Sequence, residues 1–258
     1  MGIPNIQEGI GCLLTVLLLG CSACSSPASR PSLYEEPAMV LVPAGWFLMG
    51  SDAGPSSSRP AHWVYLEAYR IDRTEVTNAQ MLAYVEATGE VPQAWHGRTA
   101  PGPSNRPATG LRWREAQAYC HWLGMRLPTE AEWEKAARGT DGRSYPWGDT
   151  WDASRANTAE SGRSGPVEVG TYPSGASPYG ALDMVGNVQE WVADYYDPGY
   201  YAVAPARAPT GPSQVLDHGL RGGSWESPKE WVTTFFRDSS HSAVPNDRTG
   251  FRCAVTLS

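Results

Sequence analysis

Residues 126–134 read RLPTEAEWE, and this stretch contains the predicted start of a helix. Thr129 is followed three positions later by Glu132, a capping-box pattern in which each side chain accepts a backbone N–H at the start of a helix. Gly139 marks the expected end of that helix, because glycine is favoured directly after the last helical turn. The predicted inward face holds Trp133, Ala136 and Ala137.

Two further helices are predicted upstream of this stretch. Thr77 and Gln80 form a second capping box, and the helix should run to the residue before Gly89. Residues 112–123 read as another helix that ends at Gly124. We expect four tryptophans to belong to the core before they belong to any binding surface: Trp113, Trp122, Trp133 and Trp147.

The other segments favour strands and loops. Residues 39–50 predict two short strands around a Pro-Ala-Gly turn, and residues 62–69 predict another strand. After Gly139 the sequence has no long helical periodicity, only short strand-like pieces between turn residues. We therefore predict one loop-rich α+β domain over residues 38–258.

Composition supports a globular protein and excludes one class of partner. Of 258 residues, 41% are hydrophobic, while 27 glycines and 22 prolines indicate many turns. Lys and Arg number 20 against 27 Asp and Glu, giving a net charge of -7 without basic runs. Because nucleic-acid binding relies on clustered positive charge, we do not expect a nucleic-acid partner.

The N-terminus is typical of an exported lipoprotein. Residues 10–20 form an apolar run of signal-peptide length that ends directly before Cys21, a pattern that resembles a bacterial lipobox. We predict a signal peptide at 1–20, lipidation of Cys21, and a flexible tether at 21–37 that holds the domain outside the cytoplasm. In a Gram-negative cell the anchor would lie in the outer membrane. The segment before the run has no Lys or Arg, and the alternative is a buried N-terminal element.

Only two of the five cysteines fall in the predicted domain, Cys120 on a helix and Cys253 on the last strand. Cys12 belongs to the signal, and Cys24 to the tether. In an oxidising compartment, Cys120 and Cys253 most simply form one long-range disulfide. A zinc site is not expected, because the neighbouring His121 would face away from Cys120 on the helix.

Seven phrases occur in the order seen in the formylglycine-generating enzyme (sulfatase-modifying factor) family, which this chain resembles. They are MVLVPAG with MG (39–45, 49–50), DRTEVTN (72–78), RLPTEAEWE (126–134), YPWG (145–148), MVGNVQEW (184–191), RGGSW (221–225) and GFRCA (250–254). The resemblance implies a single domain with a C-type-lectin-like core. Enzymes of the family oxidise a sulfatase cysteine to formylglycine with molecular oxygen and copper held by two cysteines.

The copper-binding thiols of that family are missing here. Their approximate positions, counted from Ser224, hold Ser227 and Val232, and no cysteine lies between Ser224 and Arg252. Gln189 also stands where the enzymes carry a tryptophan. Because copper(I) requires soft sulfur ligands, we do not expect copper or the family's oxidase reaction.

The resemblance also implies calcium. Its ligands would be the side chains of Asp183 and Glu190 with the carbonyls of Gly186 and Val188. The alternative is that the two carboxylates only cap a turn. A second, weaker calcium site would involve Asn157 and Thr158, although the following stretch lacks the expected Asp.

No other catalytic pattern emerges from the sequence. The five histidines show no spacing of two His plus a carboxylate: His62, His96, His121, His218 and His241. Asp217 and His218 precede Ser224, but their order and spacing fit no hydrolase triad, so the Ser224 hydroxyl should satisfy buried backbone. Residues 194–201 contain four tyrosines that cannot all be buried, which suits protein or carbohydrate contacts.

Two functions remain. The first is a membrane-tethered binding or scaffold module with a protein or peptide partner. The second is an extracytoplasmic oxidoreductase that modifies a protein or peptide through a non-copper site, as in the family's chromophore-maturing periplasmic members. The absent thiols favour the first.

Overall fold

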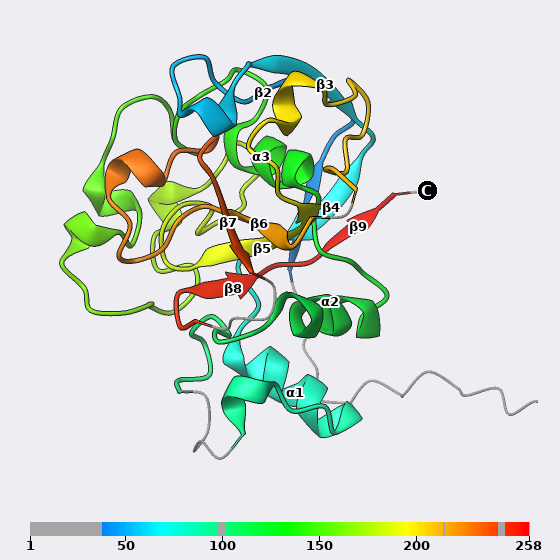
Figure 1. Cartoon of the computed structure of the whole chain (residues 1–258). Helices are drawn as coiled ribbons and strands as arrows, with labels where there is room; N and C mark the ends of the chain where they lie inside the picture. The colour runs from blue at the N-terminus through cyan, green and yellow to red at the C-terminus, as the bar shows by residue number, and fades with distance from the viewer. Residues whose placement is uncertain (1–37, 97–101, 214, 242–245, 258) are drawn as a thin grey trace, which may run out of the picture.

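The computed structural model describes residues 38–96, 102–213, 215–241 and 246–257. The predicted signal peptide, the tether and Cys21 lie outside the described residues. Figure 1 shows α1 and α2 side by side near β8, away from α3. The arrangement is the predicted mixed α and β fold with long loops.

The strands form three sheets in the described residues, with orders β1-β4-β9, β2-β3 and β7-β6-β5-β8. All pairings are antiparallel except β5 with β8. The strands are β1 (Met39–Val42), β2 (Gly45–Met49), β3 (His62–Leu66), β4 (Tyr69–Asp72), β5 (Gln189–Tyr195), β6 (Asp217–Arg221), β7 (Arg237–His241), β8 (Thr249–Phe251) and β9 (Ala254–Thr256).

The helices begin where the capping patterns predict. Thr77 caps α1 and Thr129 caps α3, each through a complete capping box. The α-helices are α1 (Asn78–Thr88), α2 (Trp113–Trp122) and α3 (Glu130–Arg138). Short 3-10 helices lie in the loops: η1 (Ser56–Ser58), η2 (Gln93–Trp95), η3 (Ala153–Arg155), η4 (Ala159–Ser161), η5 (Pro173–Gly175), η6 (Tyr200–Ala202) and η7 (Lys229–Trp231).

The strand predicted over 62–69 was wrong as a single element. The chain leaves β3 at Leu66 and begins β4 at Tyr69, because β3 pairs with β2 while β4 pairs with β1 and β9. The predicted core tryptophans also differ from one another. Trp133 is fully buried, whereas the other three are half-buried: Trp113, Trp122 and Trp147.

The predicted burial of Trp133, Ala136 and Ala137 is confirmed, and the charged residues of helix α3 are buried as well. Its charged side chains are tolerated inside because each finds polar partners. Lys135 Nζ donates to the carbonyls of Pro43 and Gly45 at 2.8 and 2.9 Å. Burial lowers the pKa of Lys135 to about 8.

Two of the three glutamates on α3, Glu130 and Glu134, connect the helix to the four-stranded sheet. Glu130 accepts both nitrogens Nε and Nη2 of Arg237 at 2.8 and 2.9 Å. Glu134 accepts Arg221 Nη2 at 2.6 Å and Arg138 Nη1 at 2.8 Å. Although burial opposes ionisation, Arg237 and Arg221 hold the pKa of Glu130 below its ordinary value. These pairs fix α3 against β6 and β7.

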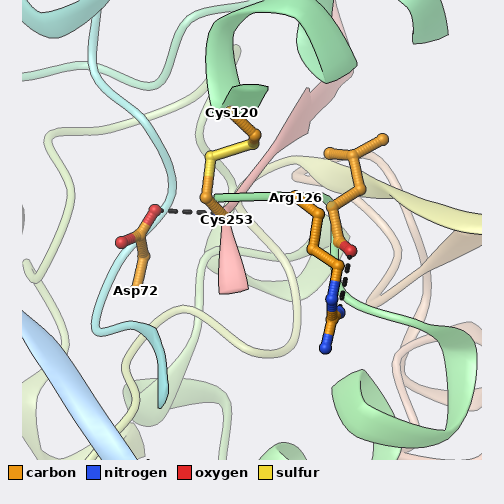
Figure 2. Close-up of a disulfide and its surroundings, with 5 residues drawn as sticks. Asp72, Cys120, Arg126 and Cys253 are labelled. Carbon is orange, nitrogen blue, oxygen red and sulfur yellow. Dashed lines mark hydrogen bonds between the residues drawn. A yellow bond between two sulfur atoms is a disulfide. The ribbon is translucent and has the colours of Figure 1, made fainter. Parts of the chain in front are cut away.

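Cys120 and Cys253 form a disulfide across 133 residues, as expected (Figure 2). Cys253 lies between β8 and β9 and not within the last strand. Both cysteines are fully buried, and the Asp72 carboxylate accepts the Cys253 N–H at 2.8 Å. The bond joins α2 to the C-terminal strands and closes one of the two main apolar clusters.

Loss of this disulfide should destabilise the domain by about 2–5 kcal/mol, because the closed loop restricts the unfolded chain. We expect the double variant Cys120→Ala, Cys253→Ala to show this loss in urea denaturation. In unreduced protein from the cell envelope, unfolded before alkylation, both thiols should be protected, with reduced protein as the control. Two alkylated thiols without reduction would contradict the disulfide and the oxidising compartment.

Candidate functional site

The positions that correspond to the family's copper cysteines lie together in the fold. A Cβ placed on Gly223 would come within 2.8 Å of Val232 Cγ1 and 3.1 Å of Ser227 Cβ. Gly223 has a φ of +65°, which favours glycine, so the backbone itself sets this close approach. The loop after β6 therefore brings Ser227 and Val232 to one point.

Neither residue offers a soft ligand there. Val232 is fully buried in a small apolar cluster with Tyr145, Ala156 and Val185. The Ser227 hydroxyl accepts the Ser224 N–H at 2.9 Å. In the part of the chain that the structure describes, the sole cysteine sulfurs are those of the disulfide.

Ser224 and Gln189, two nearby polar residues, are bonded to the protein. Ser224 is buried, and its Oγ accepts the N–H of Glu226 at 3.4 Å. Gln189, at the position of the family's tryptophan, donates from Nε2 to Thr249 Oγ1 at 3.1 Å. These contacts suit a structural turn, as expected for Ser224.

The predicted calcium loop runs from Asp183 to the start of β5 and is closely packed. Asp183 and Asn187 have φ values of 56° and 57°, an uncommon region for residues other than glycine. A Cβ on Gly186 would meet the carbonyl oxygen of Asn157 at 2.3 Å, and the Asn187 N–H donates to that same oxygen at 2.7 Å. The loop is thus held against the second predicted calcium segment.

Its two carboxylates have different surroundings. Asp183 Oδ2 accepts the Gly170 N–H at 2.6 Å, and burial, with repulsion from Glu190, raises the pKa of Asp183 to about 6. Glu190 accepts Arg252 Nε and Nη2 at 2.6 and 2.7 Å, and Trp133 Nε1 at 2.9 Å. Arg252 therefore already compensates the charge of Glu190.

The loop still carries an excess of buried negative charge. Glu75 is buried beside Asp183 and accepts Asn187 Nδ2, a contact that sequence reasoning missed. Burial raises the pKa of Glu75, and repulsion from Asp183 and Glu190 raises it further. Three carboxylates thus face Arg252, and oxygen donors with surplus negative charge are the kind of site that calcium prefers. The oxygen donors suit the ion, but the three carboxylates do not converge as one metal-binding group in the described residues.

A side-chain cluster of three or more His, Cys, Asp or Glu residues suited to a metal does not occur within the described residues. Such a cluster is a different arrangement from two carboxylates with two backbone carbonyls. At the second predicted site, Asn157 Oδ1 accepts the Ser161 hydroxyl at 2.9 Å. The Thr158 hydroxyl donates to Glu160 at 2.7 Å. A glutamate, and not the expected aspartate, therefore lies beside Thr158.

The phrases DRTEVTN and GFRCA hold the residues that sequence reasoning missed: Asp72, Glu75 and Arg252. Asp72 Oδ1 is buried without a hydrogen-bond partner, and burial raises the pKa of Asp72 to about 7. Each phrase contains a charged residue between apolar ones, which could have indicated a buried polar contact. The partner could not be found, because it lies far away in sequence. Arg252, for example, donates to the Asp72 carbonyl across 180 positions.

The other sequence candidates are separated in space. Asp217 and His218 begin β6, whereas Ser224 follows its end, so no triad forms. Of the four tyrosines in 194–201, Tyr201 is buried and donates to Glu134, and Tyr195 is 36% exposed. The expectation that they are not all buried is confirmed.

Known proteins are similar to this chain in sequence and in fold. The chain matches the sulfatase-modifying factor enzyme 1-like domain over residues 25–257. A formylglycine-generating enzyme of Streptomyces coelicolor is 33% identical and covers 88% of this chain and 91% of its own. The Mus musculus protein named inactive C-alpha-formylglycine-generating enzyme 2 is 33% identical, covering 93% and 92%. The structure of PvdO from Pseudomonas aeruginosa has a TM-score of 0.75 at 28% identity, covering 86% and 95%.

A Chlamydia caviae protein named serine/threonine-protein kinase pkn1 is 35% identical over 86% of this chain. The chain spans 38% of that protein's length. Fold and sequence together define an α+β protein built like the formylglycine-generating enzymes. The chain belongs to the sulfatase-modifying factor enzyme 1-like family.

Asp72 should make stability depend on pH. Its raised pKa means that the folded state favours the protonated acid, so its contribution is present below about pH 4 and is lost as pH rises to about 7. Asp72→Asn should retain the acceptor for Cys253 N–H and be more stable than the parent at pH 8, with little gain at pH 4. Urea denaturation at both values measures this.

The exposed Asp247→Asn, which also removes one carboxylate, is the matched control and should leave the pH profile unchanged. If Asp72→Asn is less stable at pH 8 and keeps the parent's pH profile, burial of this carboxylate does not govern the dependence.

Proposed function

We propose that this chain is an extracytoplasmic, membrane-tethered binding or scaffold module without the family's copper-dependent oxidase activity. One observation carries the proposal: the fold brings Ser227 and Val232 to one point, but they are a hydrogen-bonded hydroxyl and a buried aliphatic group. Copper(I) needs thiolates, so these residues cannot hold it as the family's enzymes do.

Family membership alone does not decide activity, because one fold supports both active and inactive members. A relative of similar length is named as an inactive formylglycine-generating enzyme, which is compatible with a non-catalytic role. The alternative is an oxidoreductase with a non-copper site. No cluster of metal-binding side chains within the described residues supports it.

A protein or peptide partner is supported by an aromatic surface on β2 and β3. Trp46 and Trp63 are 45% and 58% exposed. Trp46 packs edge to face on Tyr65, and Arg207 lies 4.4 Å above the Tyr65 ring. Exposed aromatic rings with arginine are typical of protein contact surfaces.

The tether is the part of the proposal that rests on sequence. In the described residues, no helix has the length and apolar character needed to span a bilayer. We infer attachment through acyl chains on Cys21. If labelled fatty acid does not appear on the parent chain, this hypothesis is refuted.

Calcium is the proposed stabilising ligand. Asp183 and the carbonyls of Gly186 and Val188 would hold it, with Glu190 shared between the ion and Arg252. When bound, the ion supplies positive charge that offsets the repulsion among the buried carboxylates. A ligand that binds only the folded state stabilises that state.

Calcium should therefore raise the melting temperature of the parent chain, and chelator should lower it. Asp183→Ala should show no calcium-dependent difference. Exposed Asp247→Ala, the same change outside the loop, should respond as the parent does. An unchanged melting temperature of the parent after chelation would mean that Asp183 and Glu190 only cap the turn.

The chain should not convert the cysteine of a sulfatase-motif peptide to formylglycine. Full chain, copper and oxygen are incubated with the peptide, and peptide mass reports conversion of the thiol to the aldehyde. We expect no turnover above copper alone, because Ser227 and Val232 offer no thiolate pair. A Streptomyces coelicolor formylglycine-generating enzyme serves as the positive control.

The double variant Ser227→Cys, Val232→Cys tests whether the missing thiols account for the inactivity. It should gain copper binding, whereas Ser227→Cys alone should not. Turnover by the parent chain would overturn the non-catalytic proposal.

A further inference from the structure

A cavity lies at the end of the four-stranded sheet that is formed by Tyr195 and His218. Its volume is about 650 Å³, within the usual range for small-molecule sites. On β5 and β6, Glu190 pairs with Arg221 beside the Ser224 loop, whereas Tyr195 pairs with His218 at the cavity. Five positions along a strand correspond to roughly 15 Å, so this cavity is separate from the site described above. Residues that line it include Arg112, Trp113, Arg114, Tyr195, Leu216 and His218.

His218 is the unusual group in this cavity. Its side chain lies between two aromatic rings, with centroids 3.9 Å from Trp113 and 4.4 Å from Tyr195. The residue is 5% exposed, and neither Nδ1 nor Nε2 has a hydrogen-bond partner. Buried polar atoms are nearly always bonded, so two buried imidazole nitrogens without a hydrogen-bond partner, in a residue that lines a cavity, point to a ligand.

The imidazole is neutral at pH 7. Burial, together with the charge of Arg114, lowers the pKa of His218 to about 4, against an opposing effect of Asp217. A neutral ring has one N–H and one lone pair. It can therefore donate one hydrogen bond to an acceptor in the cavity.

The cations come from the start of α2. Arg112 precedes the helix and Arg114 lies in its first turn, and both line the cavity. Arg112 Nε is buried without a hydrogen-bond partner. The first N–H groups of a helix favour an anion, and in α2 the Glu115 carboxylate of the first turn already accepts the Arg112 N–H at 2.7 Å. Two guanidinium groups in a chain of net charge -7 thus give this cavity a local positive charge.

The position of α2 is fixed by the sheet. Trp113 Nε1 donates to the Val192 carbonyl at 2.8 Å, and Trp191 Nε1 donates to the Leu111 carbonyl at 3.0 Å. The Trp113 ring therefore keeps its place against His218 without a ligand. The half-buried ring of Trp113 also forms a wall of the cavity.

We propose that this cavity binds an organic carboxylate attached to an aromatic or apolar group. The carboxylate accepts hydrogen bonds from the guanidinium groups and from the imidazole, since a planar guanidinium matches a carboxylate with two parallel bonds. The attached group packs on Trp113 and Tyr195 and against Leu216. An aromatic body is favoured because the polar donors lie beside stacked rings. The inference goes beyond the proposed function and does not depend on it.

The test titrates the full chain with indole-3-propionate by calorimetry. Indole-3-propionamide, of the same shape without the charge, and inorganic phosphate are the comparison probes. We expect saturable binding of the acid, at least tenfold weaker binding of the amide, and no competition by phosphate.

Two variants locate the binding. Arg114→Gln removes an exposed charge, and His218→Phe keeps the stacked ring but removes both nitrogens; each should weaken acid binding at least tenfold. Arg70→Gln, an exposed charge change outside the cavity, should have no effect. Thermal melting confirms that each variant is folded, and the exposed position of Arg114 keeps the test valid if His218→Phe is not.

Three outcomes overturn the proposal. Equal affinity for acid and amide would remove the role of the carboxylate. Unchanged binding by Arg114→Gln would place the ligand elsewhere. Phosphate that binds as tightly as the acid and displaces it would indicate a general anion site without the apolar component.

Discussion

The pairing of the α3 glutamates with arginines of the sheet is the constraint on which this structure depends. Glu130 binds Arg237 and Glu134 binds Arg221, all four fully or almost fully buried. Removing one partner of such a pair typically costs about 3–5 kcal/mol, because a buried charge is left uncompensated. The pairs therefore allow only one placement of α3 against β6 and β7. They also fix the point at which β6 ends and the Gly222-Gly223-Ser224 turn begins, since Arg221 is the last residue of that strand.

The ion pairs that hold α3 against the sheet do not involve Ser227 or Val232. The turn after β6 still brings Ser227 and Val232 to one point, although neither can bind copper. The backbone and the ion pairs set where residues 227 and 232 lie. Their side chains alone decide whether a metal can bind there. At the opposite end of the same sheet, His218 and the start of α2 form a positively charged cavity.

Local signals predicted part of this structure. The helices capped by Thr77 and Thr129 end where Gly89 and Gly139 indicate, because capping is decided within a few residues. The break between β3 and β4 could not be predicted, since it depends on which distant strands each one pairs with. The burial of the charged residues of α3 could not be predicted either. Its pattern of charges reads as a solvent-facing surface, and only arginines about ninety to over a hundred residues away make it an interior one. For the same reason the sequence pointed to Asp183 and Glu190 but not to Glu75 or Arg252 beside them.

The central claim is that the family scaffold persists here without a redox-metal centre. Elemental analysis of the full chain, purified from the cell envelope without chelators, measures this directly, with a formylglycine-generating enzyme loaded with copper as the control. The account predicts calcium as the retained metal, and copper and iron far below one equivalent per chain. One equivalent of copper or iron that survives dialysis would contradict it.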